Sequence, residues 1–155
     1  MPSSELIHGT CLAYGERAVL LRGVSGAGKS DLALRCLHCF PAFEANAVSF
    51  QLVADDQIIL SKAEDGRLMA SAPEALAGRI EIRGVGIVRA SDVVAELRLA
   101  VDLVPSDAVP RLPDYPFPTV DYLGIRIPLI ALAPFEASAP LKVWHSLMQL
   151  DRTAP

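Results

Sequence analysis

The sequence contains little cysteine, and the cysteines it has do not form the pattern of an extracellular scaffold. Cys11, Cys36 and Cys39 are the three in 155 residues. Because this count is odd and low for the length, a disulfide framework is excluded and a cytoplasmic location is expected. Cys36 and Cys39 have Cys-x-x-Cys spacing, which without a second such pair is weak evidence for zinc or redox chemistry. Cysteines late in a predicted helix are expected to pack as small hydrophobic residues.

The sequence also lacks an excess of positive charge. Its 14 lysines and arginines are outnumbered by 18 aspartates and glutamates, which gives a formal net charge of -4. A surface devoted to nucleic acid or to an anionic membrane would need a basic face, so neither partner is expected. Residues 1–8 lack the basic start and apolar run of a signal peptide, and no apolar stretch reaches the roughly 20 residues that span a bilayer.

There is no internal repeat and no low-complexity tract, so one domain is expected over residues 1–155. With 52% hydrophobic residues, the chain can form a sizeable core without disulfides or a structural metal. Hydrophobic periodicity predicts strands at 18–22, 48–54, 96–103 and 125–132, a hairpin around 64–66, helices at 29–39, 73–78 and 141–150, and an irregular segment at 104–118. The mixture predicts an α/β fold with a mixed sheet and additional antiparallel strands.

What the sequence does contain is a complete phosphate-binding loop. The segment Gly23-Val24-Ser25-Gly26-Ala27-Gly28-Lys29-Ser30 matches the pattern GxxxxGK[ST], with an apolar run before it and a helical pattern after it. Glycines let backbone N–H groups turn toward phosphates, and a helix start adds partial positive charge. Lys29 is expected to reach the terminal phosphates and Ser30 to ligate Mg²⁺. The loop predicts binding of ATP and Mg²⁺; the alternative is a chance glycine turn.

Two adjacent carboxylates follow the next apolar run. Asp55 and Asp56 come directly after Leu52-Val53-Ala54. Ligands gather at the carboxyl ends of parallel strands, where the phosphate loop is also expected to lie. One carboxylate could then hold a metal ion or its water, while the other accepts the proton of an attacking hydroxyl. The alternative is an ordinary aspartate-rich turn at the end of a strand.

Four motifs together resemble the C-terminal catalytic domain of HPr kinase/phosphorylase. They are His8-Gly9, the loop 23–30, the run 52–56 and the string Ile80-Glu81-Ile82-Arg83-Gly84-Val85-Gly86-Ile87. The last string is characteristic of the family, and all four occur in the family's order over residues 6–90. The resemblance implies a P-loop kinase core related to that of phosphoenolpyruvate carboxykinase, in the short form found in alphaproteobacteria. It also implies a bacterial enzyme that uses ATP and Mg²⁺ to phosphorylate a serine of HPr, a phosphocarrier protein of the phosphotransferase system.

The resemblance assigns roles on the acceptor side of the reaction. Asp56 matches the residue that takes the serine proton, and Asp55 matches the neighbour that helps to place metal or substrate. His8 matches the histidine that accompanies Asp56 and tunes its charge or binds incoming phosphate. From the residues alone, His8 could equally be an ordinary strand histidine.

Further roles concern phosphate and metal. Glu81 matches the family's magnesium ligand, working with Ser30, and Arg83 lies in a loop associated with both directions of catalysis. Arg111 matches a catalytic arginine whose fork would contact phosphate. The alternative is that Glu81 and Arg83 lie on the solvent-exposed face of a strand and have no catalytic role. Many members also run a phosphorolysis that consumes inorganic phosphate and releases pyrophosphate.

Departures from the family pattern leave two properties open. Leu129 stands where longer members tend to carry a lysine near the proline, so the phosphorolytic reaction is less secure than the kinase reaction. The C-terminal helix is curtailed, so a homo-oligomer is implied but a hexamer is not established.

Two other functions remain as alternatives. A P-loop kinase of a small metabolite would need an arginine-rich lid, and none is evident. A non-catalytic nucleotide sensor would not need Asp55, Asp56, His8 or Glu81.

Overall fold

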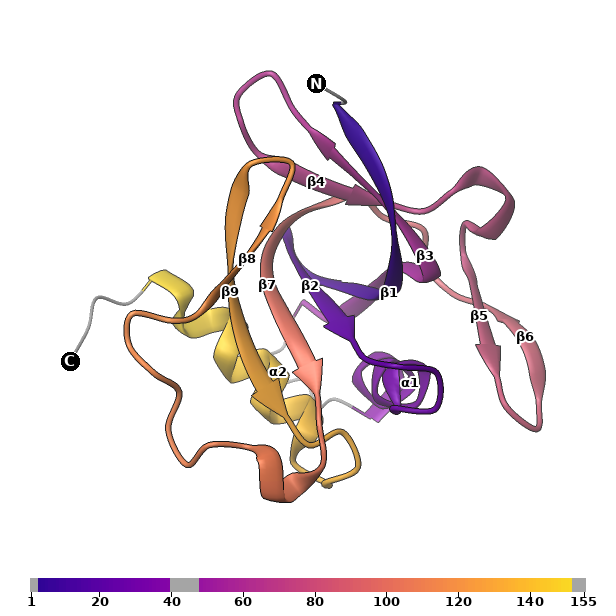
Figure 1. The fold of residues 1–155 in the computed structure, drawn as a ribbon. Helices are drawn as coiled ribbons and strands as arrows, with labels where there is room; N and C mark the ends of the chain where they lie inside the picture. The colour runs from indigo at the N-terminus through magenta and orange to yellow at the C-terminus, as the bar shows by residue number, and fades with distance from the viewer. Residues whose placement is uncertain (1–2, 40–47, 152–155) are drawn as a thin grey trace.

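The computed structural model describes residues 3–39 and 48–151, in which one seven-stranded mixed sheet dominates (Figure 1). Its strands are β1 (Ser4–Tyr14), β2 (Arg17–Arg22), β3 (Phe50–Lys62), β4 (Leu68–Ser71), β7 (Ala95–Leu103), β8 (Thr119–Tyr122) and β9 (Ile125–Leu132). They are ordered β2-β1-β3-β4-β7-β9-β8, and β2 also pairs with β7. The pairs β2–β7 and β7–β9 are parallel and the others antiparallel, which confirms the mixed sheet expected from the sequence.

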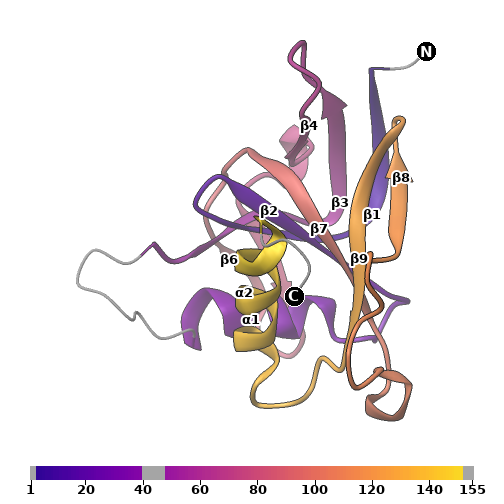
Figure 2. The same ribbon diagram turned by 90° about the vertical axis from the view of Figure 1, so that its left-hand side faces the viewer.

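The pairing of β2 with β7 curls the sheet, so the strands bury both of their faces. One apolar cluster fills the inside of the curl, with Leu20, Ile58 and Leu97 among its fully buried members. The other lies between the sheet and the two helices α1 (Lys29–Cys39) and α2 (Ala139–Met148), which cover the same face (Figure 2). Leu21 of β2 and Leu32 of α1 belong to this second cluster. Adjacent residues of β2 thus point into different cores, as the alternation of a strand requires.

Short elements connect these layers. The hairpin of β5 (Arg79–Ile82) and β6 (Gly86–Arg89) forms a separate two-stranded sheet that projects beside β3 (Figure 1). Three single turns of 3₁₀ helix are η1 (Glu74–Leu76), η2 (Ser106–Ala108) and η3 (Gln149–Asp151). The short helix expected at 73–78 forms as the 3₁₀ turn η1, over fewer residues than expected. None of the described helices is long and apolar enough to cross a membrane.

Two strands contain irregularities, and one of them also runs further than the sequence predicted. Strand β3 does not end at Asp55 and Asp56 but continues through them to Lys62, with a bulge near Val53 where its register with β1 shifts. Strand β7 has its own irregularity, since Ala18 pairs with Leu97 and Val19 with Leu99. A bulged residue reverses the faces of a strand. Leu97 therefore faces the inner cluster, while the later leucines of β7 face the helices.

Candidate functional site

The loop between β2 and α1 has the geometry of a phosphate-binding nest. Gly26 and Gly28 have φ angles of 85° and 101°, the left-handed region that favours glycine. The tip of the loop is open to solvent, and Val24 is 79% exposed. Lys29, by contrast, is buried, and its Nζ donates hydrogen bonds to the carbonyl oxygens of Gly23 at 2.6 Å and Val24 at 2.9 Å. A buried ammonium group held by neutral carbonyls is well suited to receive an anion.

Asp55 links the loop to the sheet. Its carboxylate is 7% exposed and accepts hydrogen bonds from the Thr10 hydroxyl at 2.8 Å and the Ser30 hydroxyl at 3.0 Å. The backbone N–H of Glu81 donates to the same carboxylate at 3.4 Å. Three elements besides β3 therefore meet at one carboxylate: β1, the first turn of α1 and the hairpin of β5 and β6. We call this hairpin the signature hairpin, because it carries the string 80–87. Thr10 was not singled out by sequence reasoning, although it follows His8 on the same face of β1.

The oxygen atoms at this point suit Mg²⁺ bound together with phosphates. Ser30 and Asp55 provide a hydroxyl and a carboxylate about one hydrogen bond apart, and the backbone N–H of Glu81 on the adjoining hairpin bonds to the same carboxylate. Within residues 3–39 and 48–151, no group of three or more His, Cys, Asp or Glu side chains is arranged to hold a metal by itself. Mg²⁺ usually takes one or two carboxylates and completes its shell with substrate phosphates and water, so this donor set fits it.

Asp56 faces a different environment from its neighbour. It pairs with Gly9 in the ladder between β1 and β3, but its φ is 73°, in the left-handed region. This conformation costs most residues about 1–2 kcal/mol, and aspartate tolerates it better than most. The side chain is 66% exposed, and its Oδ1 lies 3.3 Å from Nε2 of His8, itself 57% exposed. The unusual backbone conformation therefore falls, within a continuous strand, on the residue predicted to be the base, and such conformations are common at functional sites.

The signature hairpin lies next to this cluster and is open to solvent. Glu81 and Arg83 are exposed, as are Val85 at 73% and Ile87 at 69%. Its described link to the carboxylates is the hydrogen bond from the backbone of Glu81 to Asp55. The structure thus brings the hairpin beside the cluster, while the roles assigned to its two charged side chains stay predictions.

Arg111 lies apart from the other predicted residues. It is exposed and lines a hollow of about 220 Å³ between β9, α2 and the segment that follows β7. Phe117 and Lys142 line the same hollow. Among the described interactions, none joins Arg111 to Asp55 or to the phosphate loop, so its catalytic assignment stays a prediction.

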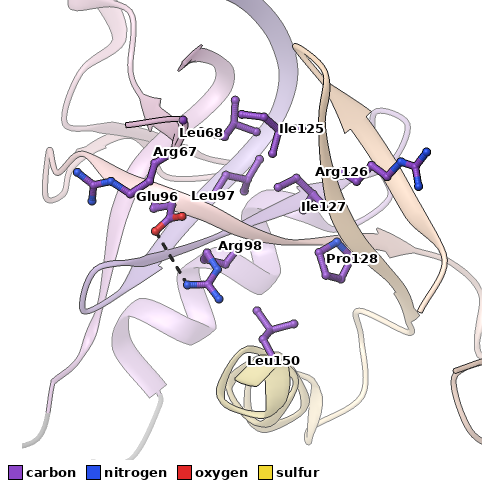
Figure 3. Close-up of a pocket in the computed structure, with 11 residues that line it drawn as sticks. Arg67, Leu68, Glu96, Leu97, Arg98, Ile125, Arg126, Ile127, Pro128 and Leu150 are labelled. Atoms are coloured by element: carbon purple, nitrogen blue, oxygen red, sulfur yellow. Dashed lines mark ion pairs between the residues drawn. The ribbon is translucent and has the colours of Figure 1, made fainter. Parts of the chain in front are cut away.

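Another hollow, of about 290 Å³, lies near the start of β7, away from the phosphate loop (Figure 3). Glu96 lines it at the start of β7, whereas the phosphate loop lies beside the far end of that strand, near Asp102. Three arginines also line it, but the guanidinium groups of Arg67 and Arg126 point away from each other, and only Arg98 turns toward the middle. The floor between them is mainly aliphatic. This hollow therefore does not assemble a converging set of polar groups.

The two cysteines whose side chains are described pack as small hydrophobic residues. Cys11 and Cys36 are buried and not in disulfides, and burial raises the pKa of the Cys36 thiol to about 12. Thiolate is the reactive and metal-binding form, so redox or zinc chemistry at Cys36 is disfavoured. The side chain of Cys39 lies outside the described residues.

Comparisons with known proteins identify relatives of this chain in sequence and in fold. The model of the HPr Serine kinase C-terminal domain family matches residues 1–97. The HPr kinase/phosphorylase of Bordetella pertussis is 31% identical over 136 residues, 81% of this chain and 41% of that protein. The HPr kinase/phosphorylase of Thermoanaerobacter sp. (strain X514) is 39% identical over 82 residues, 53% of this chain and 24% of that protein. The chain thus spans between a quarter and about two fifths of the length of these relatives.

A solved structure extends the likeness to nearly the whole chain. The HPr(Ser) kinase/phosphatase from Coxiella burnetii superimposes with a TM-score of 0.74 at 28% sequence identity, covering 94% of this chain and 88% of that chain. The P-loop kinase fold of the HPr kinase type expected from the sequence is thereby confirmed. The likeness also includes the region beyond residue 97, which the family model does not match.

Proposed function

The chain belongs to the HPr serine kinase C-terminal domain family, and on this premise we propose that it transfers the γ-phosphate of ATP to a serine hydroxyl of an HPr-type phosphocarrier protein. One observation carries the proposal. Asp55, which binds Ser30 of the phosphate loop, is followed directly by Asp56, which faces solvent beside His8. A group suited to the phosphate donor and a group suited to a hydroxyl acceptor are therefore adjacent residues. Because Asp56 is exposed, a serine on a folded protein could reach it.

On the donor side, we propose that the backbone N–H groups of residues 23–30 hold the phosphates and that Lys29 exchanges its carbonyl partners for phosphate oxygens. Ser30, Asp55 and Glu81 would hold Mg²⁺ together with the phosphates. When bound, this ion neutralises charge on the phosphoryl group being transferred. Asp55 also orients the Ser30 hydroxyl, since it accepts the hydrogen bond from that group.

On the acceptor side, Asp56 takes the proton of the serine hydroxyl while the serine oxygen bonds to the γ-phosphorus. The bond from that phosphorus to the β,γ-bridging oxygen breaks, and ADP leaves with the electron pair. His8 holds the Asp56 carboxylate in place through the contact at 3.3 Å. Arg83, on the hairpin next to Asp55, is proposed to contact the transferred group with its guanidinium fork.

The central test is phosphorylation of HPr by the purified chain with ATP and Mg²⁺, detected as a phosphoserine mass shift. Asp56→Asn should lower the rate of transfer by about 10²–10⁴-fold, because it removes a general base, while ATP affinity changes little. Asparagine tolerates the left-handed backbone of this position, so the fold should persist. Asp107→Asn, at an exposed aspartate of η2, is the matched control and should be neutral.

Two outcomes would contradict the proposal. Undiminished transfer by Asp56→Asn would exclude Asp56 as the base. Turnover of a small hydroxyl compound without transfer to HPr would instead favour a metabolite kinase. Transfer of phosphate from phosphorylated HPr to inorganic phosphate, with release of pyrophosphate, would establish the reverse reaction.

The proposal carries two further expectations, a cytoplasmic location and a homo-oligomeric assembly. Fractionation of cells expressing the protein measures the first. Size-exclusion chromatography with light scattering measures the second and distinguishes a hexamer from smaller assemblies.

A further inference from the structure

An aromatic side chain from a distant part of the chain lies against the phosphate loop. Phe135, in the connection from β9 to α2, packs so closely on Gly28 that a Cβ added to this glycine would lie 2.9 Å from Cζ of the ring. It would also lie 3.2 Å from Cβ of Pro134. A separation of 2.9 Å essentially never occurs for a real Cβ, so a side chain at position 28 would displace the ring from its place against the loop. The sequence motifs did not point to Phe135.

The connection that carries Phe135 is fastened on both sides of the ring. Arg35 of α1 donates hydrogen bonds to the carbonyl oxygens of Pro134 and, at 3.1 Å, of Glu136. The Glu136 carboxylate accepts a hydrogen bond from Lys142 at 2.5 Å. Bonds to α1, which begins at the phosphate loop, and to α2, which follows the connection, therefore hold the chain on both sides of Phe135. A fixed backbone lowers the cost of ordering the side chain it carries when a ligand binds.

Phe135 is nevertheless 70% exposed. A phenylalanine of this exposure leaves much of its apolar ring in water, although the backbone around it is fixed. The location of the ring also points to a ligand. The neighbouring parallel strands β2, β7 and β9 have their carboxyl ends at one edge of the sheet. The phosphate loop follows β2 and the Phe135 connection follows β9. Ligands of open α/β sheets bind outside this edge.

We propose that Phe135 is the platform on which the purine base of the nucleotide stacks. The inference rests on the proposed function, in which the loop binds the phosphates of ATP. With the phosphates in the nest, the ribose and base must extend from it across an adjoining surface, and the ring beside Gly28 provides an apolar face there. Stacking uses the π-face that all bases share, so the platform strengthens binding without selecting adenine over guanine.

Binding of two Mg²⁺-loaded probes by calorimetry tests the platform: ATP, which has a base, and inorganic tripolyphosphate, which has none. Phe135→Ala should weaken ATP binding about tenfold and leave tripolyphosphate binding unchanged, as expected for loss of one base stack. GTP should lose the same factor as ATP. Phe135→Tyr, which keeps the aromatic face, should restore ATP affinity. Tyr115→Ala removes another exposed aromatic ring and should bind both probes as the wild type does.

The outcomes separate the two hypotheses. If the wild type binds neither probe, the proposed function fails and the platform fails with it. If the wild type binds both and Phe135→Ala weakens both equally, the ring supports the phosphate nest and the platform alone is overturned. Unchanged ATP binding with a raised KM for HPr would also overturn it, because the ring would then belong to a protein-docking surface.

Discussion

The two halves of the site differ in how they are held, although they meet at adjacent residues. On the donor half, Asp55 is buried and tied to Thr10 and Ser30 through its carboxylate. On the acceptor half, Asp56 is two-thirds exposed, has a left-handed backbone and contacts His8 at 3.3 Å. Under the proposed function, the donor half must organise a small, highly charged ligand, which favours fixed polar groups. The acceptor half must then admit another protein, which requires open surface.

The comparison explains why β3 passes through the site instead of ending there. If Asp56 kept ordinary strand geometry, it would point to the face opposite Asp55, following the alternation of side chains. The left-handed turn at Asp56 breaks that alternation while the ladder with β1 continues on both sides. One strand can then serve both halves of the site. Four substitutions test this division of the site into two halves.

The largest combined effect on nucleotide binding and transfer is expected from Lys29→Ala, which removes the buried cation of the donor half. Transfer should fall by about 10²–10³-fold, the usual result of removing one fixed donor that stabilises transition-state charge. Nucleotide affinity should fall as well, unlike in Asp56→Asn. Steady-state kinetics and calorimetry measure the two effects. Lys62→Ala, at the exposed end of β3, is the matched control, and equal losses in both variants would contradict the assignment.

The next effect is on stability and concerns Asp55→Ala. Removing the carboxylate leaves the buried Thr10 hydroxyl without its acceptor, so the free energy of unfolding should fall by about 1–3 kcal/mol. Urea denaturation measures this change. Combining it with Thr10→Val in a double-mutant cycle isolates the bond, since the double variant should lose less than the sum of the singles. Additive losses would show that the bond contributes nothing.

Asp56→Gly is expected to have the opposite sign. Glycine adopts a φ of 73° without strain, so the free energy of unfolding should rise by about 0.5–1 kcal/mol even though transfer is lost. Gln57→Gly, at the next position of the strand, is the control and should be destabilising by a similar amount. A decrease in both variants would mean that Asp56 carries no strain.

The phosphate loop of the donor half could be predicted from sequence because its residues are contiguous. The pattern from Gly23 to Ser30 specifies a loop and a helix start within eight residues, and both lie where expected, while the chemistry assigned to them stays a prediction. The pairing of His8 with Asp56 could be inferred only by resemblance, since it joins residues 48 positions apart. Their contact depends on the register between β1 and β3, which no local pattern reports.

The parts that sequence reasoning missed are all long-range. Thr10 reads as an ordinary strand residue until β3 brings Asp55 opposite it. Phe135 reads as a loop aromatic until β9 carries it to Gly28. The end of β3 was misplaced because two aspartates usually terminate a strand, whereas here one is satisfied by buried donors and the other turns to solvent. In each case tertiary pairing, and not local preference, determines the structure.

The smallest effect is expected at Arg111, the predicted site residue that belongs to neither half. It lines a hollow with Phe117 and Lys142 instead of contacting the cluster around Asp55. We therefore expect Arg111→Ala to lower kcat/KM for HPr about fivefold or less, the range of an exposed charge that acts at a distance. Arg111→Lys should then match the wild type, because lysine keeps the positive charge and a charge acting at a distance needs no guanidinium fork. A loss of more than a hundredfold in Arg111→Ala that lysine fails to restore would show instead that the guanidinium fork binds the reacting phosphate, which would require the segment after β7 to move over the donor half.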